Sequence, residues 1–116
     1  MNQDCVFCGI SSGEIPGVRI YENANFFSIP DANPKVKGHS LVISKKHFKT
    51  ILDLPASLGQ EFIDCIKKTS VKLIGGENAS GFNLISNNFE SAGQVVHHLH
   101  IHIIPRRNGD GLSLIA

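Results

Sequence analysis

Three histidines alternate with apolar residues near the C-terminus of this 116-residue chain, in the run His98-Leu99-His100-Ile101-His102-Ile103-Ile104. In a β-strand, alternate side chains share a face, so the imidazoles would line one face at a repeat of about 6.6–6.8 Å while the apolar residues face the core. An imidazole can act as a nucleophile, exchange protons or bind a metal ion near pH 7. A solvated strand face rich in histidine and a metal cluster are the alternatives, although strand spacing is wide for three ligands of one tetrahedral ion.

A second set of reactive side chains is the pair Cys5-x-x-Cys8. An isolated pair at this spacing is a weak signal of a metal site, because two cysteines that are simply small buried hydrophobic residues give the same pattern. A redox motif fits less well because no βαβ pattern surrounds the pair. The third cysteine, Cys65, falls in an apolar helical pattern and is expected in the core.

Composition limits the class of protein. Hydrophobic residues make up 41% of the chain and charged residues 18%, with a formal net charge of +1. These values predict one globular domain over residues 1–116 and no nucleic-acid or membrane partner. The start Met1-Asn2-Gln3-Asp4 has no signal-peptide pattern, no apolar run approaches the ~20 residues of a membrane span, and three cysteines fit a reducing compartment. We therefore expect a cytoplasmic protein.

Strands dominate the pattern of the elements that must position these residues. Alternating or continuous apolar runs predict five strands, at residues 18–22, 25–29, 40–44, 82–86 and 95–104. A turn at 23–25 would join the first two into a hairpin, and residues 31–38 read as a loop. The class is therefore α+β with a five-stranded antiparallel sheet, and residues 107–116 are expected to be an irregular tail.

Two helices complete the prediction. A short one would be capped by Asp4 and end at Gly13, and a long one would run from about 55 to 74. Ser57 and Gln60 have capping-box spacing, and 75–76 is a Gly-Gly pair that would end the long helix. One stripe of the long helix is apolar or small and would face the sheet: Leu58, Phe62, Ile66, Thr69 and Leu73.

The histidine run matches the pattern His-φ-His-φ-His-φ-φ, where φ is apolar, and the chain resembles the histidine triad (HIT) superfamily from about residue 5 to 106. Further matching segments occur in the family's order: DCVFC at 4–8, GHSLVISKKH at 38–47, FNLISNN at 82–88, GQVV at 93–96 and IIPR at 103–106. The resemblance implies a single HIT domain with its core at about 5–106. It also implies a homodimer whose two sheets join into one of ten strands, which would cover an open sheet edge.

The resemblance also implies a covalent mechanism. The family's middle histidine attacks the α-phosphorus of a nucleotide derivative, and water then hydrolyses the nucleotidyl-histidine. This role would fall on His100, with its other ring nitrogen held by a backbone carbonyl of the same strand. His102 would contact the phosphate and the leaving atom, as proton donor or hydrogen-bond partner. His39 would lie near His98 and shape the phosphate site.

Binding residues follow from the same match. Asp31 would bind both ribose hydroxyls. Without the family match, a turn residue after Pro30 is an equally good interpretation of Asp31. Asn87 and the backbone of Gln94 would contact the phosphate, and Val95 stands where relatives carry Ser or Thr, which predicts weaker activity. An apolar set would form the base pocket, with plain core packing as the alternative: Val6, Phe7, Ile10, Ile29 and Leu41.

A structural zinc site is also implied, with ligands Cys5, Cys8, His47 and His98. The leading expectation is hydrolysis of purine nucleoside 5′-phosphate derivatives, most simply an adenosine phosphoramidate. A dinucleoside polyphosphate hydrolase is the nearest rival. An AMP-binding sensor or scaffold, and a zinc-storing protein without nucleotide affinity, are alternatives from other classes.

Overall fold

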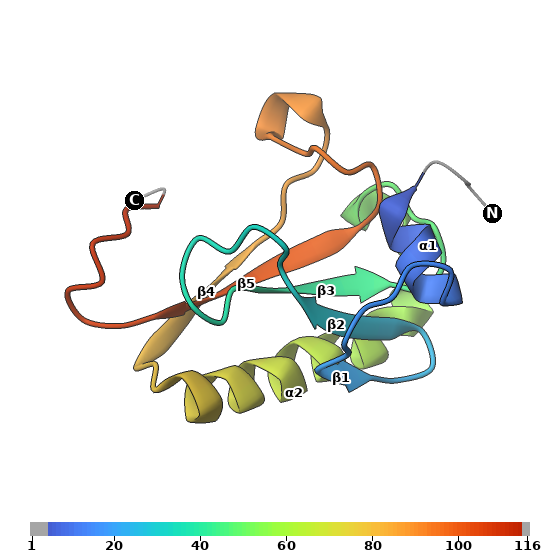
Figure 1. Cartoon of the computed structure of the whole chain (residues 1–116). Helices are drawn as coiled ribbons and strands as arrows, with labels where there is room; N and C mark the ends of the chain where they lie inside the picture. Colours follow the sequence, from blue (N-terminus) through green and yellow to red (C-terminus); the bar gives the residue numbers. More distant parts are fainter. Residues whose placement is uncertain (1–4, 115–116) are drawn as a thin grey trace.

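Five antiparallel strands form one sheet in the order β1-β2-β3-β5-β4 (Figure 1). The computed structural model describes residues 5–114. The strands are β1 Tyr21–Glu22, β2 Phe26–Pro30, β3 Ser40–Ser44, β4 Gly81–Ile85 and β5 His100–Arg106. The predicted class, α+β with a five-stranded antiparallel sheet and one long helix, is confirmed.

The two helices lie on opposite faces of the sheet. The long helix α2 (Gly59–Glu77) runs along one face, and the short helix α1 (Val6–Ser12) packs on the other (Figure 1). Three short 3₁₀ turns are η1 Ile51–Asp53, η2 Ala56–Leu58 and η3 Glu90–Ala92. Among residues 5–114, no helix has both the length and the hydropathy that a membrane span requires.

Alternation along the strands divides the core in two. Leu41 and Ile43 of β3 pack with α1, whereas Val42 between them packs with α2. Likewise Ile101 and Ile103 of β5 point to α2, so His100 and His102, which alternate with them, face the α1 side, as the alternation predicts. Each fully buried aliphatic side chain contributes about 1.5–3 kcal/mol, which makes a reversal of this strand's faces costly.

The predicted stripe of α2 does face the sheet. Its apolar members lie in or against the α2-side core, and the ring of Phe62 packs 5.1 Å from that of Phe26 on β2. Thr69 is buried, and its hydroxyl donates to the Ser28 hydroxyl of β2 at 2.7 Å. Cys65 is fully buried in the same core, as expected.

The predicted ends of the helices are wrong in detail. α2 continues through Gly75 and Gly76 to Glu77, because Asn78 adopts the left-handed conformation (φ 53°) and its N–H bonds to the Ile74 carbonyl. α2 has no side-chain cap, so the predicted Ser57/Gln60 capping box does not form. A capping box is present at η1 instead, where it is formed by Thr50 and Asp53. Cys5 caps α1, and Gly13 ends it as predicted; Asp4 lies outside the described residues.

Two strand predictions also need correction. The first strand is limited to Tyr21–Glu22, and Val18 is 79% exposed, because Pro16 and Gly17 keep the preceding chain out of the ladder. The last strand begins at His100, not at 95. Its neighbour β3 ends at Ser44, and the Leu99 N–H turns instead to the Phe48 carbonyl at 2.6 Å, so the preceding residues leave the sheet.

Gly38 and Gly75 provide a matched test of backbone constraint. Gly38 precedes β3 with φ +91°, and an added Cβ would lie 2.6 Å from Glu77 Cγ, whereas a Cβ at Gly75 meets no atom within 4 Å. We expect Gly38→Ala to lower the free energy of unfolding by about 1–3 kcal/mol. Gly75→Ala should raise it by about 0.5–1 kcal/mol, since the residue lies inside a helix. Urea unfolding checks both, and a Gly38→Ala variant as stable as wild type contradicts the account.

Candidate active site

A cavity of about 660 Å³ lies on the α1 side of the sheet. This volume suits a small organic ligand. Most of the predicted binding and catalytic residues line it, drawn from α1, β2, β3, β5 and two loops: Val6, Phe7, Ile10, Ile29, Asp31, His39, Leu41, Asn87, His100 and His102. His98 and Gln94 are not among the lining residues.

One part of the cavity wall is apolar. α1 supplies Val6, Phe7 and Ile10, and the strands add Ile29 and Leu41. The Phe7 ring meets His100 edge-on at 5.0 Å between centroids, so the apolar wall adjoins the histidines. A flat aromatic group could be buried here with a polar group reaching the imidazoles.

His100 has a defined tautomer. Its Nδ1 lies 2.7 Å from the carbonyl oxygen of His98, and because a carbonyl only accepts, Nδ1 carries the proton. The lone pair is therefore on Nε2. The resemblance implied a carbonyl of the same strand as the acceptor. The acceptor is the carbonyl of His98, two residues before β5 begins, and the bond fixes the orientation of a ring that is only 8% exposed.

His39 and His102 form a second defined pair. The Lys35 N–H donates to His39 Nδ1 at 3.0 Å, so the His39 proton is on Nε2, which lies 3.0 Å from His102 Nδ1. His102 then carries its own proton on Nε2 and is a hydrogen-bond donor. Burial, and to a smaller extent the charge repulsion of the neighbouring histidines, lowers the pKa of His102 to about 4. Burial also lowers the pKa of His39, so both rings are neutral near pH 7.

The position of His39 corrects the expectation that it lies near His98. Ser40 pairs with Ile103 in the sheet, which places His39 beside the later half of β5. His98 lies beyond the other end of β3, against Ser44. The carboxylate of Asp31 lies 3.4 Å from His39 Nε2 and accepts from the Asn33 N–H at 2.8 Å, so it borders the same pair.

Four side chains meet beside α1: Cys5, Cys8, His47 and His98. Their ligating atoms all lie within 4.8 Å of one another. Nδ1 of His98 is 3.2 Å from Cys5 Sγ, and Nδ1 of His47 is 3.1 Å from Cys8 Sγ. His98 Nε2 donates to the Ser44 carbonyl at 2.7 Å, which leaves its Nδ1 lone pair directed at the thiols. The set therefore suits a tetrahedral metal ion.

Distance alone would also group Asp31, His39 and His102 as a metal site. The tautomers separate the two clusters. His39 Nδ1 already accepts from a backbone N–H, so its Nε2 holds a proton and faces the group as a donor. Burial lowers the pKa of His98 to about 4, and that ring is neutral with a lone pair toward the thiols. The Cys-His cluster is therefore the better metal site of the two.

The loop that follows β4 closes one side of the cavity. The Gln94 side chain accepts from the Phe89 N–H and donates to the Lys49 carbonyl, both at 2.7 Å, so its amide holds the loop in place. Asn87 and Val95 line the cavity from this loop, and Val95 is 85% exposed. The role of Gln94 that the structure shows is thus to shape the loop.

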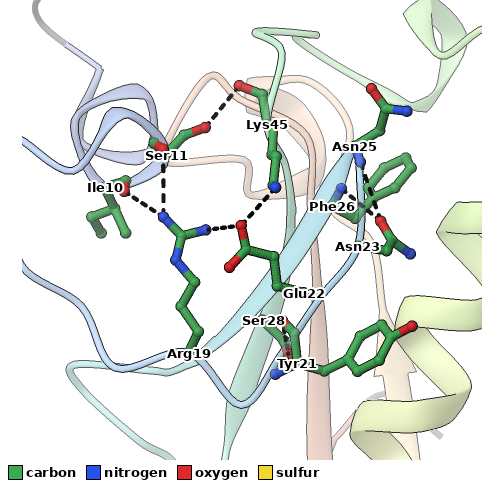
Figure 2. A network of polar contacts seen from close by, with 10 residues as sticks. All are labelled: Ile10, Ser11, Arg19, Tyr21, Glu22, Asn23, Asn25, Phe26, Ser28 and Lys45. Atoms are coloured by element: carbon green, nitrogen blue, oxygen red, sulfur yellow. Dashed lines mark hydrogen bonds and ion pairs between the residues drawn. The ribbon is translucent and has the colours of Figure 1, made fainter.

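Arg19 anchors α1, and sequence reasoning missed it. Its guanidinium donates to the carbonyls of Ile10 and Ser11 at 2.9 and 3.4 Å (Figure 2). The guanidinium carbon also lies 4.2 Å from the centroid of the Phe27 ring. The last carbonyls of a helix lack partners within it, and a cation at this end is favourable. Arg19 also pairs with Glu22 at 3.6 Å, which links α1 to β1.

Lys45 completes this network. Its ammonium lies 2.6 Å from the Glu22 carboxylate, and its backbone carbonyl accepts from the Ser11 hydroxyl at 3.1 Å (Figure 2). The hydrogen bond from Lys45 lowers the pKa of Glu22. The helix that carries Phe7 and Cys8 is therefore fixed to β1 and to the residue after β3.

Comparison with known proteins gives consistent matches. A family model for the HIT domain matches residues 12–109. The chain is 40% identical over 112 residues to adenylylsulfatase HINT3 of Arabidopsis thaliana, covering 97% of this chain and 57% of that protein. It is 39% identical over 104 residues to adenosine 5′-monophosphoramidase hnt1 of Schizosaccharomyces pombe, covering 90% of this chain and 75% of that protein.

Solved structures match over the whole fold. A protein from Streptococcus mutans UA159 superposes with a TM-score of 0.92 at 34% identity, over 100% of this chain and 74% of that one. A zinc-bound histidine triad family protein from Mycobacterium smegmatis superposes with a TM-score of 0.88 at 40% identity, over 96% of this chain and 81% of that one.

The anchoring of α1 can be tested with Arg19→Met, which keeps an apolar stem over Phe27 but removes the hydrogen bonds. We expect a loss of about 1–2 kcal/mol in the free energy of unfolding. Amide hydrogen exchange should also become faster at Gly9 and Gly13, whose N–H groups bond within and at the end of α1. Arg107→Met is the matched control, because Arg107 donates to the Glu77 carbonyl at the end of α2. Unchanged exchange in α1 of Arg19→Met would show that the contact is not an anchor.

Proposed function

Because the chain belongs to the HIT domain family, we propose that it is a nucleotide hydrolase of the histidine triad type. Its substrates are purine nucleoside 5′-phosphate derivatives of the adenosine phosphoramidate type, and the reaction passes through a nucleotidyl-histidine on His100. The observation that carries this proposal is the bond from His100 Nδ1 to the His98 carbonyl, which leaves the Nε2 lone pair available on a ring that lines the cavity.

The first step forms a bond between His100 Nε2 and the α-phosphorus and breaks the bond from phosphorus to the leaving group. Positive charge develops on the ring, and the Nδ1–H bond to the carbonyl stabilises it. His102, neutral with its proton on Nε2, donates a hydrogen bond to the phosphoryl oxygen or the leaving atom. Water then attacks phosphorus, releases the nucleoside monophosphate and restores His100.

The rest of the cavity binds the nucleotide. The apolar wall from α1, β2 and β3 takes the base, and Asp31, at the edge of that wall, accepts hydrogen bonds from the ribose hydroxyls. Asn87 reaches the phosphate from the loop after β4. Gln94 keeps the shape of this loop, because its backbone N–H donates to the Phe89 carbonyl at 3.1 Å and the residue does not line the cavity. His39 positions His102 through the hydrogen bond between them.

The Cys-His cluster holds a structural zinc ion in this proposal. Cys5, Cys8, His47 and His98 supply two thiolates and two imidazoles at suitable spacing, and the zinc-bound relative from M. smegmatis supports the choice of metal. A bound ion would cross-link α1 to His98, two residues before β5, and would fix the His98 backbone that holds His100.

The proposal extends to assembly and location. The whole chain, 1–116, forms one HIT domain with a core at about 5–106, and two copies form a homodimer in the cytoplasm. β4 is an edge strand with half-exposed Phe82 and Leu84, and Ile63 and Val71 are exposed on α2, which supports pairing of this side with a second copy. Thiolate zinc ligands favour a reducing compartment.

The covalent step is tested with His100→Ala and adenosine 5′-phosphoramidate, by following AMP release. We expect the rate to fall at least ~10³-fold, because the variant lacks the nucleophile while the base and ribose contacts remain. His97→Ala is the control, since His97 is exposed and outside the cavity lining. Equal rates in His100→Ala and wild type would reject the covalent role, and AMP binding without any turnover in wild type would favour the sensor alternative.

The metal site is tested by elemental analysis. Wild type should contain about one zinc per chain, and Cys8→Ser should contain much less and unfold at a lower temperature, because a structural ion contributes folding free energy. Cys65→Ala is the control for loss of a buried cysteine, since Cys65 lies in the α2 core, and its metal content should equal that of wild type. The same stoichiometry in Cys8→Ser and wild type would count against the site.

A further inference from the structure

The cavity carries few fixed charges. Among its lining residues within 5–114, Asp31 is the one carboxylate and Lys35 the one lysine or arginine. The His39–His102 pair is neutral near pH 7, since burial lowers the pKa of both rings. The α-phosphate of a bound nucleotide would therefore meet hydrogen-bond donors from imidazoles and backbone, with one cation at the rim.

Lys35 is fixed at one end of the cavity by its own backbone. Its N–H donates to His39 Nδ1 at 3.0 Å, which places the residue beside the His39–His102 pair. The ammonium contributes to the lowered pKa of both these histidines, so its field reaches that end of the site. In the proposed function, this is the end where His102 donates a hydrogen bond to the phosphoryl oxygen or the leaving atom.

The Lys35 ammonium is available to a ligand. Lys45 pairs with Glu22, and Lys72 donates to the Ile20 carbonyl. Within residues 5–114, in contrast, no carboxylate lies within 4.0 Å of the Lys35 ammonium, and the residue is exposed at the rim of the cavity. An anion that reached this rim would find an unpaired cation beside neutral donors.

We propose that Lys35 is a specificity-determining residue that pairs with negative charge on the leaving group. Sulfate and phosphate are leaving groups of this class, and ammonia from a phosphoramidate is not. The inference rests on the proposed function and adds the feature that Lys35 favours substrates with an anionic leaving group. Without it, the Asp31 carboxylate and the α-phosphate would both repel a further anion entering the same cavity.

The test compares adenosine 5′-phosphosulfate with adenosine 5′-phosphoramidate, which share the adenosine 5′-phosphoryl group and differ in leaving-group charge. We expect Lys35→Gln to lower kcat/KM for the phosphosulfate about three- to fivefold, the scale of an exposed ion pair. The change for the phosphoramidate should be below about 1.5-fold, since that leaving group offers no charge to pair. The hydrogen bond to His39 survives because the backbone makes it.

Two further variants separate charge from general effects. Lys37→Gln removes a lysine from the same loop that does not line the cavity, so neither substrate should be affected. Lys35→Arg keeps the positive charge, so its ratio of kcat/KM for the phosphosulfate to kcat/KM for the phosphoramidate should equal that of wild type. The wild-type preference for the phosphosulfate should also weaken as salt is raised, whereas Lys35→Gln should respond less.

The outcomes are distinct. Equal losses on both substrates, or no loss on either, would overturn the role of Lys35 while leaving the hydrolase proposal intact. Failure of wild type to release AMP from either compound would overturn the proposed function itself, and this inference with it.

Discussion

The directions of three backbone hydrogen bonds decide which nitrogen of each central imidazole carries the proton. The carbonyl of Ser44 accepts a hydrogen bond from Nε2–H of His98, and the carbonyl of His98 accepts one from Nδ1–H of His100. The backbone N–H of Lys35 donates to Nδ1 of His39, which places the proton of His39 on Nε2. Since Nε2 of His39 then donates to Nδ1 of His102, the proton of His102 is on its Nε2. His98 therefore directs a lone pair at two thiols, and His100 has a lone pair on Nε2. His102, in contrast, has a proton on Nε2 that it can donate.

His98 joins the two sites. Its ring faces the thiols of the cluster, while its carbonyl holds the ring of His100. α1 joins them a second time, because Cys8 faces the cluster and Phe7 packs edge-on against both His98 and His100. Loss of order in the Cys-His cluster would therefore reach the cavity by two routes, through α1 and through the backbone of His98.

Local patterns in the sequence were enough for part of this arrangement. Strict alternation from His100 to Ile103 predicts which side chains face the helix and which face the cavity, because the strand period allows only two choices. The position of His39 was predicted wrongly, since it depends on the register between β3 and β5, which no local pattern records. The Gly-Gly pair at 75–76 wrongly predicted the end of the long helix, because the residue that adopts the left-handed conformation and ends the helix is Asn78.

Arg19 and Lys35 could not be found in this way for a further reason. Each acts through a single long side chain or one backbone group that reaches an element distant in sequence or across a loop, so neither belongs to a periodic pattern. The position of Lys35 matters because buried neutral imidazoles cannot balance the charge of a phosphate: desolvation opposes their protonation. The few fixed charges at the rim, Asp31 and Lys35, therefore have a larger share in selecting ligands than a site with charged histidines would give them.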